Sequence, residues 1–279
     1  MSGTLYLVGT PIGNLSDMSP RTAEIFSSVD FIAAEDTRVT LKLLNHLGIK
    51  KPLVSYYEHN RAESGEKILS RLLAGESCAL ATDAGMPAIS DPGEDIVSQC
   101  HDAGVEVIAV PGPCAAVCAL ALSGLPTGRF TFEGFLSTVK KNRFAHLEEL
   151  KTERRTMIFY EAPHKLKATL SDMAEYFGGD RRISVSRELT KLHEETFRCT
   201  LEEAVKRYED TPPKGEFVLI IEGAPEPAEP EISFEDALEQ VVTLTESGMS
   251  LKDSVKQVAK STGFGKNRLY DAMLKRNNG

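Results

Sequence analysis

Short apolar runs alternate with helical patterns through the first half of this 279-residue chain. The apolar runs that predict strands are residues 5–8, 31–34, 53–56, 78–81 and 105–110. The helical patterns between and after them are residues 22–28, 39–47, 66–73, 94–103 and 115–122. Gly48, Gly75 and Gly104 stand where three of these helices should end. The alternation predicts an α/β domain over residues 1–125, with a mostly parallel sheet and right-handed crossovers.

Three loops that follow strands of this half have unusual sequences: residues 9–14, 82–93 and 111–116. The second holds two glycines and two prolines and exceeds the roughly two to six residues usual for such a connection. We expect Asp91 to cap the helix that follows, with Pro92 at its first position. Because ligands of open parallel sheets bind beyond the carboxyl ends of the strands, the three loops predict a ligand site at that edge.

The rest of the chain divides by composition. Residues 126–224 predict a second α/β domain, with strands at 156–160, 182–186 and 217–221 and helices at 142–150, 165–176 and 201–208. Residues 225–231 are acidic and proline-rich, which is typical of a solvated linker. Residues 232–279 predict a basic domain of three short helices, the first capped by Ser233 with Asp236 at its third position.

Charge and composition narrow the function classes. The net charge is −9, but the residues from Ser250 onward carry +5 and the rest −14. No apolar run is long enough to span a bilayer, and the N-terminus has no signal-peptide pattern. Five scattered cysteines indicate a reducing cytoplasm, and six dispersed histidines give no metal site. The chain lacks both a Gly-x-Gly-x-x-Gly after its first strand and a P-loop, which disfavours NAD enzymes and P-loop ATPases.

Polar runs follow three of the predicted strands: residues 34–38, 57–61 and 187–191. Any one of them is typical of a solvated surface, but three at strand ends indicate the polar rim of an active site. In the basic tail, Lys252, Lys256 and Lys260 recur every four residues and share a helix face. That face is compatible with a solvated surface, a packing module or a nucleic-acid contact.

Taken in order, residues 3–15, 34–38, 83–85, 111–116, 159–164, 187–191 and 214–216 resemble the tetrapyrrole (precorrin) methylase family, and specifically its ribosomal-RNA branch. The resemblance covers nearly the whole chain. Tetrapyrrole enzymes usually carry Gly-x-Gly-x-Gly after the first strand, where this chain has Gly9-Thr10-Pro11-Ile12-Gly13. The departure fits the RNA branch and disfavours a corrinoid or porphyrin substrate.

The resemblance implies two α/β domains with S-adenosylmethionine bound in the cleft between them. The residues it places at the cofactor are Pro11, Asp83, Ala84, Gly85, Ile89, Ser90, Cys114, Ala115, Tyr160, Glu161, Gly215 and Glu216. The reaction it implies is methylation of a cytidine 2′-hydroxyl in small-subunit ribosomal RNA. The candidate bases for that reaction are Asp36, His59 and Glu188, and the candidates for holding phosphate or stabilising developing negative charge are Arg38 and Lys191.

The resemblance further implies a cytoplasmic homodimer that acts on the assembled 30S subunit. Two alternatives stay open. One is an enzyme of the same fold that methylates a small tetrapyrrole, and the other is a non-catalytic RNA-binding assembly factor that uses the basic tail.

Overall fold

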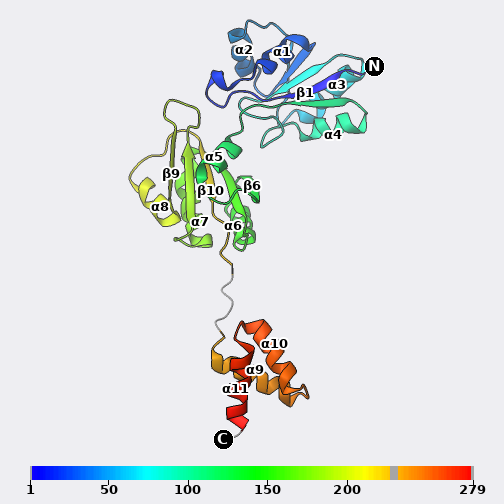
Figure 1. The fold of residues 1–279 in the computed structure, drawn as a ribbon. Helices are drawn as coiled ribbons and strands as arrows, with labels where there is room; N and C mark the ends of the chain where they lie inside the picture. The colour runs from blue at the N-terminus through cyan, green and yellow to red at the C-terminus, as the bar shows by residue number, and fades with distance from the viewer. Residues whose placement is uncertain (1, 227–231, 278–279) are drawn as a thin grey trace. The chain divides into compact units, whose positions relative to one another are not determined.

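The computed structural model describes residues 2–226 and 232–277 and divides the chain into two compact units, residues 1–224 and 225–279 (Figure 1). Residues 227–231 of the predicted acidic linker lie outside the described residues. None of the described helices is long and apolar enough to cross a membrane.

The first sheet contains five parallel strands in the order β3-β2-β4-β1-β5. Their bounds are β1 Thr4–Val8, β2 Phe31–Ala34, β3 Leu53–Ser55, β4 Cys78–Ala81 and β5 Glu106–Val110. Every residue of β2 and β4 is buried, as expected for parallel strands covered on both faces. The predicted parallel sheet is therefore confirmed, and its strand order places the carboxyl ends of β4, β1 and β5 side by side.

Helices cover both faces of this sheet (Figure 1). One face packs against α1 (Pro20–Ser28) and α2 (Thr37–His46), and the other against α3 (Arg61–Leu73) and α4 (Glu94–Asp102). The predicted terminal glycines Gly48, Gly75 and Gly104 have φ values of +69°, +99° and +69°, which glycine adopts without strain.

The expectation that Asp91 caps α4 is wrong. The helix begins at Glu94, and its N-cap is Gly93, with φ +155°. A Cβ on Gly93 would lie 2.9 Å from the Cβ of Ala88, so the loop closes on itself there. The close approach delays the helix and leaves the carboxylate of Asp91 outside the capping position.

The second sheet is mixed, with the strand order β6-β7-β10-β8-β9, and only β6 and β7 run parallel. Its strands are β6 Phe130–Phe135, β7 Thr156–Glu161, β8 Arg182–Arg187, β9 Glu195–Thr200 and β10 Phe217–Ile221. The two edge strands β6 and β9 were not predicted from the sequence. One face packs against α6 (Lys140–Leu150), α7 (Pro163–Phe177) and α8 (Leu201–Glu209), and α5 (Ala115–Ser123) covers the other.

The C-terminal unit is a three-helix domain of α9 (Phe234–Glu246), α10 (Leu251–Thr262) and α11 (Lys266–Asn277). The Ser233 hydroxyl accepts a hydrogen bond from the Asp236 amide at 3.0 Å, which confirms the predicted cap. Val241, Val255 and Leu269 form part of a core of its own.

Candidate functional site

The loops after β1, β4 and β5 converge through backbone contacts. Thr10 and Gly85 exchange two backbone hydrogen bonds, with N···O distances of 2.9 and 3.1 Å. A Cβ on Gly9 would lie 2.6 Å from the Cα of Gly112, and a Cβ on Gly112 would lie 2.7 Å from the Cα of Gly9. Only glycine permits this approach. The predicted ligand edge of the first sheet is thus a single block of interlocked loops.

The second sheet contributes strand ends that are distant in sequence. Antiparallel pairing sets Phe217 opposite both Glu161 and Arg187, and Val218 opposite Tyr160. The end of β7, the end of β8 and the start of β10 therefore lie at one edge.

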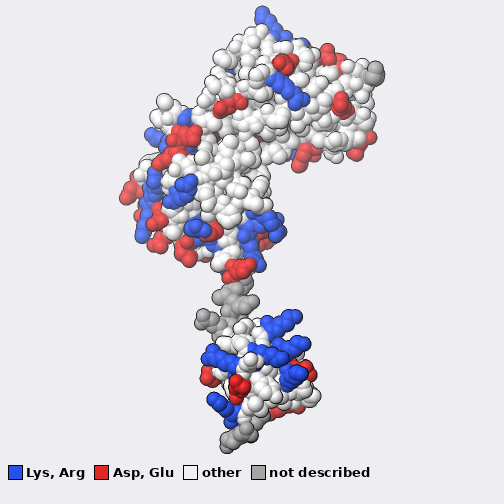
Figure 2. Space-filling model, viewed as in Figure 1, with Lys and Arg blue, Asp and Glu red and all other residues white. Residues whose placement is uncertain are grey.

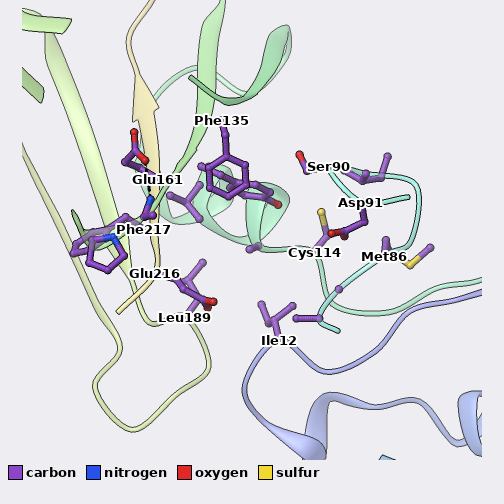
Figure 3. Close-up of a pocket in the computed structure, with 18 residues that line it drawn as sticks. Ile12, Met86, Ser90, Asp91, Cys114, Phe135, Glu161, Leu189, Glu216 and Phe217 are labelled. Carbon is purple, nitrogen blue, oxygen red and sulfur yellow. Dashed lines mark hydrogen bonds between the residues drawn. The ribbon is translucent and has the colours of Figure 1, made fainter. Parts of the chain in front are cut away.

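A cavity of about 400 Å³ lies between the loop block and this edge (Figure 3). That volume is within the range of small-molecule and cofactor sites. Residues of the first half and of the β5–α5 connection line one side: Ile12, Ala84, Gly85, Met86, Ile89, Ser90, Asp91, Cys114 and Ala115. Residues of the second half line the other: Phe135, Tyr160, Glu161, Ala162, Pro163, Leu189, Glu216, Phe217 and Val218.

Most of the predicted cofactor residues line this cavity. They are Ala84, Gly85, Ile89, Ser90, Cys114, Ala115, Tyr160, Glu161 and Glu216. Pro11, Asp83 and Gly215 do not line it, although each immediately precedes a lining residue. Gly215 has φ +87°, and its hydrogens face the Glu188 side chain so closely that a Cβ would lie 2.4 Å from Glu188 Cγ.

None of the five predicted catalytic residues lines the cavity: Asp36, Arg38, His59, Glu188 and Lys191. Asp36 instead caps α2 by accepting a hydrogen bond from the Arg38 amide at 2.8 Å, and it forms an ion pair with the Arg38 guanidinium at 2.5 Å. The hydrogen bonds from Arg38 lower the pKa of Asp36 to about 2, which makes this carboxylate a weak base. His59 is exposed, and its ring meets the Tyr57 ring edge-on at 6.3 Å.

Lys191 and Glu188 belong to a cluster that borders the cavity through Glu216. Lys191 Nζ donates to Glu188 Oε1 at 2.9 Å and to Glu216 Oε2 at 2.7 Å. Glu188 Oε1 also accepts from the Glu216 amide at 3.0 Å. Partial burial alone would raise the pKa of Glu188, but the hydrogen bonds from Lys191 and Glu216 leave that pKa below its ordinary value. The charge of Lys191 is likewise compensated by two carboxylates.

Strained backbone is concentrated in the two loops that border the cavity. Among the described residues, the non-glycine positions with left-handed φ are Ala88 (+66°), Ser90 (+61°), Glu188 (+52°) and Thr190 (+66°). Such conformations cost of order 1–3 kcal/mol each and accumulate where function requires a fixed geometry. Ser90 and Leu189, which lies between the last two, both line the cavity.

The carboxylates at the cavity differ in how they are held. Glu161 is almost fully buried, and its oxygens accept hydrogen bonds from the Ala162 amide at 2.8 Å and the Thr169 hydroxyl at 2.6 Å. Asp91 has no hydrogen bond within the described part of the chain. Burial, together with the nearby charges of Glu35 and Asp83, raises the pKa of Asp91 to about 7.

Several cavity residues were not predicted as site residues. Leu189, Phe217 and Val218 are apolar residues next to or within strands and look like ordinary core in the sequence. Phe135 lies in the unpredicted strand β6, and Asp91 was assigned to the cap. Ile12 and Met86 lie within loops whose glycines and prolines did predict a site.

The sequence and the fold of this chain are both similar to those of known methyltransferases. The family model of Tetrapyrrole (Corrin/Porphyrin) Methylases matches residues 4–205. A relative named Ribosomal RNA small subunit methyltransferase I, from Synechocystis, is 47% identical to this chain, and the alignment covers 98% of each chain. A second relative of the same name, from Halalkalibacterium halodurans, is 49% identical, and the alignment covers 96% of this chain and 94% of the relative. The crystal structure of uroporphyrin-III-C-methyltransferase from Thermus thermophilus superposes with a TM-score of 0.56 at 18% identity, over 79% of this chain and 94% of that one.

Proposed function

Because the chain belongs to the tetrapyrrole methylase family, we propose that it transfers the methyl group of S-adenosylmethionine to the 2′-hydroxyl of a cytidine in small-subunit ribosomal RNA. The observation that carries this proposal is the near-full-length similarity to relatives named as small-subunit ribosomal RNA methyltransferases. The choice of a cytidine 2′-hydroxyl follows from the sequence resemblance to the ribosomal-RNA branch.

The cavity has the chemistry that a methylsulfonium donor needs. Among the described residues, those lining it include three carboxylates and no lysine, arginine or histidine. Such a lining suits a cationic ligand and disfavours a polyphosphate nucleotide. Apolar side chains such as Ile12, Leu189 and Val218 suit the adenine ring.

The donor, when bound, supplies an electrophilic methyl group for in-line displacement. This chain's residues would bind and orient it: the backbone of residues 84–90 and 114–115 from one side, and Tyr160 and Glu216 from the other. Alignment of the attacking oxygen is expected to supply most of the rate enhancement.

The C-terminal unit supports an RNA partner. Lys252, Lys256 and Lys260 are exposed along α10, and none of the three forms an ion pair among the described residues. Figure 2 shows Lys and Arg side chains over the visible face of this unit. Clustered unpaired lysines attract phosphate by releasing counterions.

We further propose that the protein acts in the cytoplasm as a homodimer on the assembled 30S subunit. An acidic body with one basic unit favours a large structured target contacted at a few basic points. The homodimer follows from the family resemblance alone, and sedimentation of the purified protein tests it.

The proposed reaction is tested by mapping 2′-O-methyl groups in small-subunit RNA from cells with and without this protein. One cytidine should lose its mark in the deletion strain and regain it with purified protein and S-adenosylmethionine. An unchanged pattern would refute the proposal. Calorimetry with S-adenosylmethionine separates an enzyme from a pure RNA-binding factor, which should show no heat of binding.

Replacing Lys252, Lys256 and Lys260 together by Ala tests the RNA-binding face. We expect weaker binding to small-subunit RNA and a salt slope reduced by about two to three, because roughly 0.7–0.9 counterions are released per phosphate contact and three contacts are removed. Lys42→Ala, an exposed lysine on α2, is the control. A small-molecule methylase of the same fold would keep full activity in the triple variant.

A further inference from the structure

The side chain of Asp91 occupies an unusual position for a carboxylate in a long loop. Its sequence context, Ser-Asp-Pro-Gly, is typical of a helix cap, yet α4 begins three residues later with Gly93 as the cap. Asp91 is half-buried and lines the cavity, where Figure 3 shows it among the loop residues Ser90, Met86 and Cys114. The side chain is therefore free of the structural role that its sequence predicts.

The other carboxylates near the cavity are occupied. Asp36 caps α2 and pairs with Arg38, Glu161 is held by Thr169 and a backbone amide, and Glu188 is held by Lys191. Asp91 accepts no hydrogen bond from any described residue. An unengaged carboxylate in a cavity is available to a ligand atom.

The groups that face Asp91 are acidic or neutral. Glu35, directly after β2, and Asp83, two residues after β4, contribute negative charge, and Tyr160 from β7 faces Asp91 across the cavity. Glu35 and Asp83 are tied together, because Glu35 Oε2 accepts from the Asp83 amide at 3.2 Å. No lysine or arginine interacts with Asp91 among the described residues. Such surroundings favour the protonated form of a carboxyl group.

We propose that Asp91 is the general base that accepts the proton of the attacking ribose 2′-hydroxyl, an inference that rests on the proposed function. In this step the O–H bond breaks and its proton passes to the Asp91 carboxylate. The oxygen forms a bond to the methyl carbon, and the carbon–sulfur bond breaks with its electron pair moving to sulfur. The products are the 2′-O-methyl ether, S-adenosylhomocysteine and protonated Asp91, which returns its proton to solvent.

The surroundings of Asp91 match this task. Burial and the charges of Glu35 and Asp83 raise its pKa to about 7, which is close to the working pH and is the condition under which a general base is most effective. The base is active when deprotonated. The bound donor is cationic and lowers this pKa, so the rate of the chemical step should rise about tenfold per pH unit up to an inflection at or below about pH 7 and level off above it.

The first test uses Asp91→Asn in single-turnover methylation of small-subunit RNA between pH 5.5 and 8.5. We expect the rate at pH 7.5 to fall about 10²–10⁴-fold and the inflection at or below about pH 7 to disappear. The affinity for S-adenosylmethionine, measured by calorimetry, should stay within about threefold. Asp91→Glu should keep the inflection, and Glu94→Gln, an exposed carboxylate three residues further on, should behave as the wild type.

The second test moves the inflection without touching Asp91. Because Glu35 raises the pKa of Asp91, Glu35→Gln should shift the inflection to lower pH while retaining an acceptor for the Asp83 amide. An inflection at an unchanged pH in Glu35→Gln would contradict the assignment.

A readout independent of activity is thermal stability. A carboxyl whose pKa is raised in the folded state contributes fully to stability below its unfolded-state pKa of 3.8 and loses that contribution as the pH rises through its folded-state pKa of about 7. Asn does not ionise, so the melting temperature of Asp91→Asn relative to the wild type should be higher at pH 8 than at pH 5. An equal difference at both values would overturn the proposal.

Two further outcomes would overturn the base role while leaving the proposed function intact. One is a wild-type rate and pH profile in Asp91→Asn. The other is a loss of donor affinity greater than about tenfold with an unchanged rate at saturating donor, which would make Asp91 a donor-binding residue. Failure of the wild type itself to methylate small-subunit RNA would instead refute the proposed function.

Discussion

The two halves of residues 1–224 contribute different kinds of residue to one cavity. The first half is a parallel sheet whose strands all end at the same edge, so its connecting loops gather there and supply backbone, small side chains and the carboxylate of Asp91. The second half is mostly antiparallel, and strand residues such as Tyr160 and Val218 form its side of the cavity together with Leu189 and Glu216, which flank strands. With Asp91 as the proposed base, we infer that the loops of the first half determine the chemistry and the residues of the second half determine the shape of the cavity.

The largest effect is expected where the loops of the first half interlock. In Gly112→Ala the new Cβ would lie 2.7 Å from Gly9 Cα and 2.8 Å from Gly9 C, so the loops after β1 and β5 must separate. We expect a loss of about 1–3 kcal/mol in the free energy of unfolding and a donor affinity lower by at least about tenfold. Urea unfolding and calorimetry measure the two quantities.

Gly128→Ala is the matched control, because a Cβ there would meet no atom within 4 Å. Its donor affinity should equal that of the wild type. Wild-type affinity in Gly112→Ala would show that the interlocked loops do not set the geometry of the cavity.

A smaller effect on donor affinity is expected from replacing Phe135, which lines the cavity from the second half. Phe135 is 54% exposed at the cavity, and its ring lies 5.6 Å from the Tyr160 ring. Removing an aromatic contact of about 0.5–1.5 kcal/mol in Phe135→Ala should weaken donor binding about two- to twelvefold. The pH profile of the rate should not change, because Asp91 is untouched. Phe130→Ala on the same strand is the control, since Phe130 is 43% exposed but does not line the cavity. A shifted pH profile in Phe135→Ala would show that the second half also sets the chemistry.

The two sheets also differ in how well their strands could be predicted from the sequence. All five strands of the first sheet were predicted to within one residue at either end, because each is a short apolar run and three of the following helices end at glycine. The edge strands β6 and β9 were missed. Their sequences, FTFEGF and ETFRCT, mix polar with apolar residues, none of which is fully buried, and β6 contains a glycine at φ +61°.

The residues of the candidate site also differ in how well they could be predicted: those of the first half's loops were predictable, and several of the second half were not. Glycine and proline in residues 9–14, 82–93 and 111–116 predicted the loop side, because such loops are recognisable without tertiary information. Leu189 and Phe217 of the second half could not be predicted, since only the pairing of β10 with β7 and β8 brings them to the cavity. Asp91 was assigned to a cap because the contact between Gly93 and Ala88 that moves the helix start is not visible in the local sequence.

The smallest effect is expected at Glu188, a carboxylate of the second half. Its Oε1 already accepts hydrogen bonds from Lys191 Nζ and the Glu216 amide, and Gln would keep one acceptor oxygen for them. Glu188→Gln should therefore weaken donor binding a fewfold through Glu216, which lines the cavity, consistent with a partly screened charged hydrogen bond of about 1 kcal/mol. Its single-turnover rate at saturating donor should stay within about tenfold of the wild type.

Glu202→Gln on α8, whose carboxylate pairs only with Lys206 among the described residues, controls for the loss of one charge. If Glu188→Gln instead loses as much rate as Asp91→Asn without losing donor affinity, the base lies in the second half and the division between chemistry and shape fails.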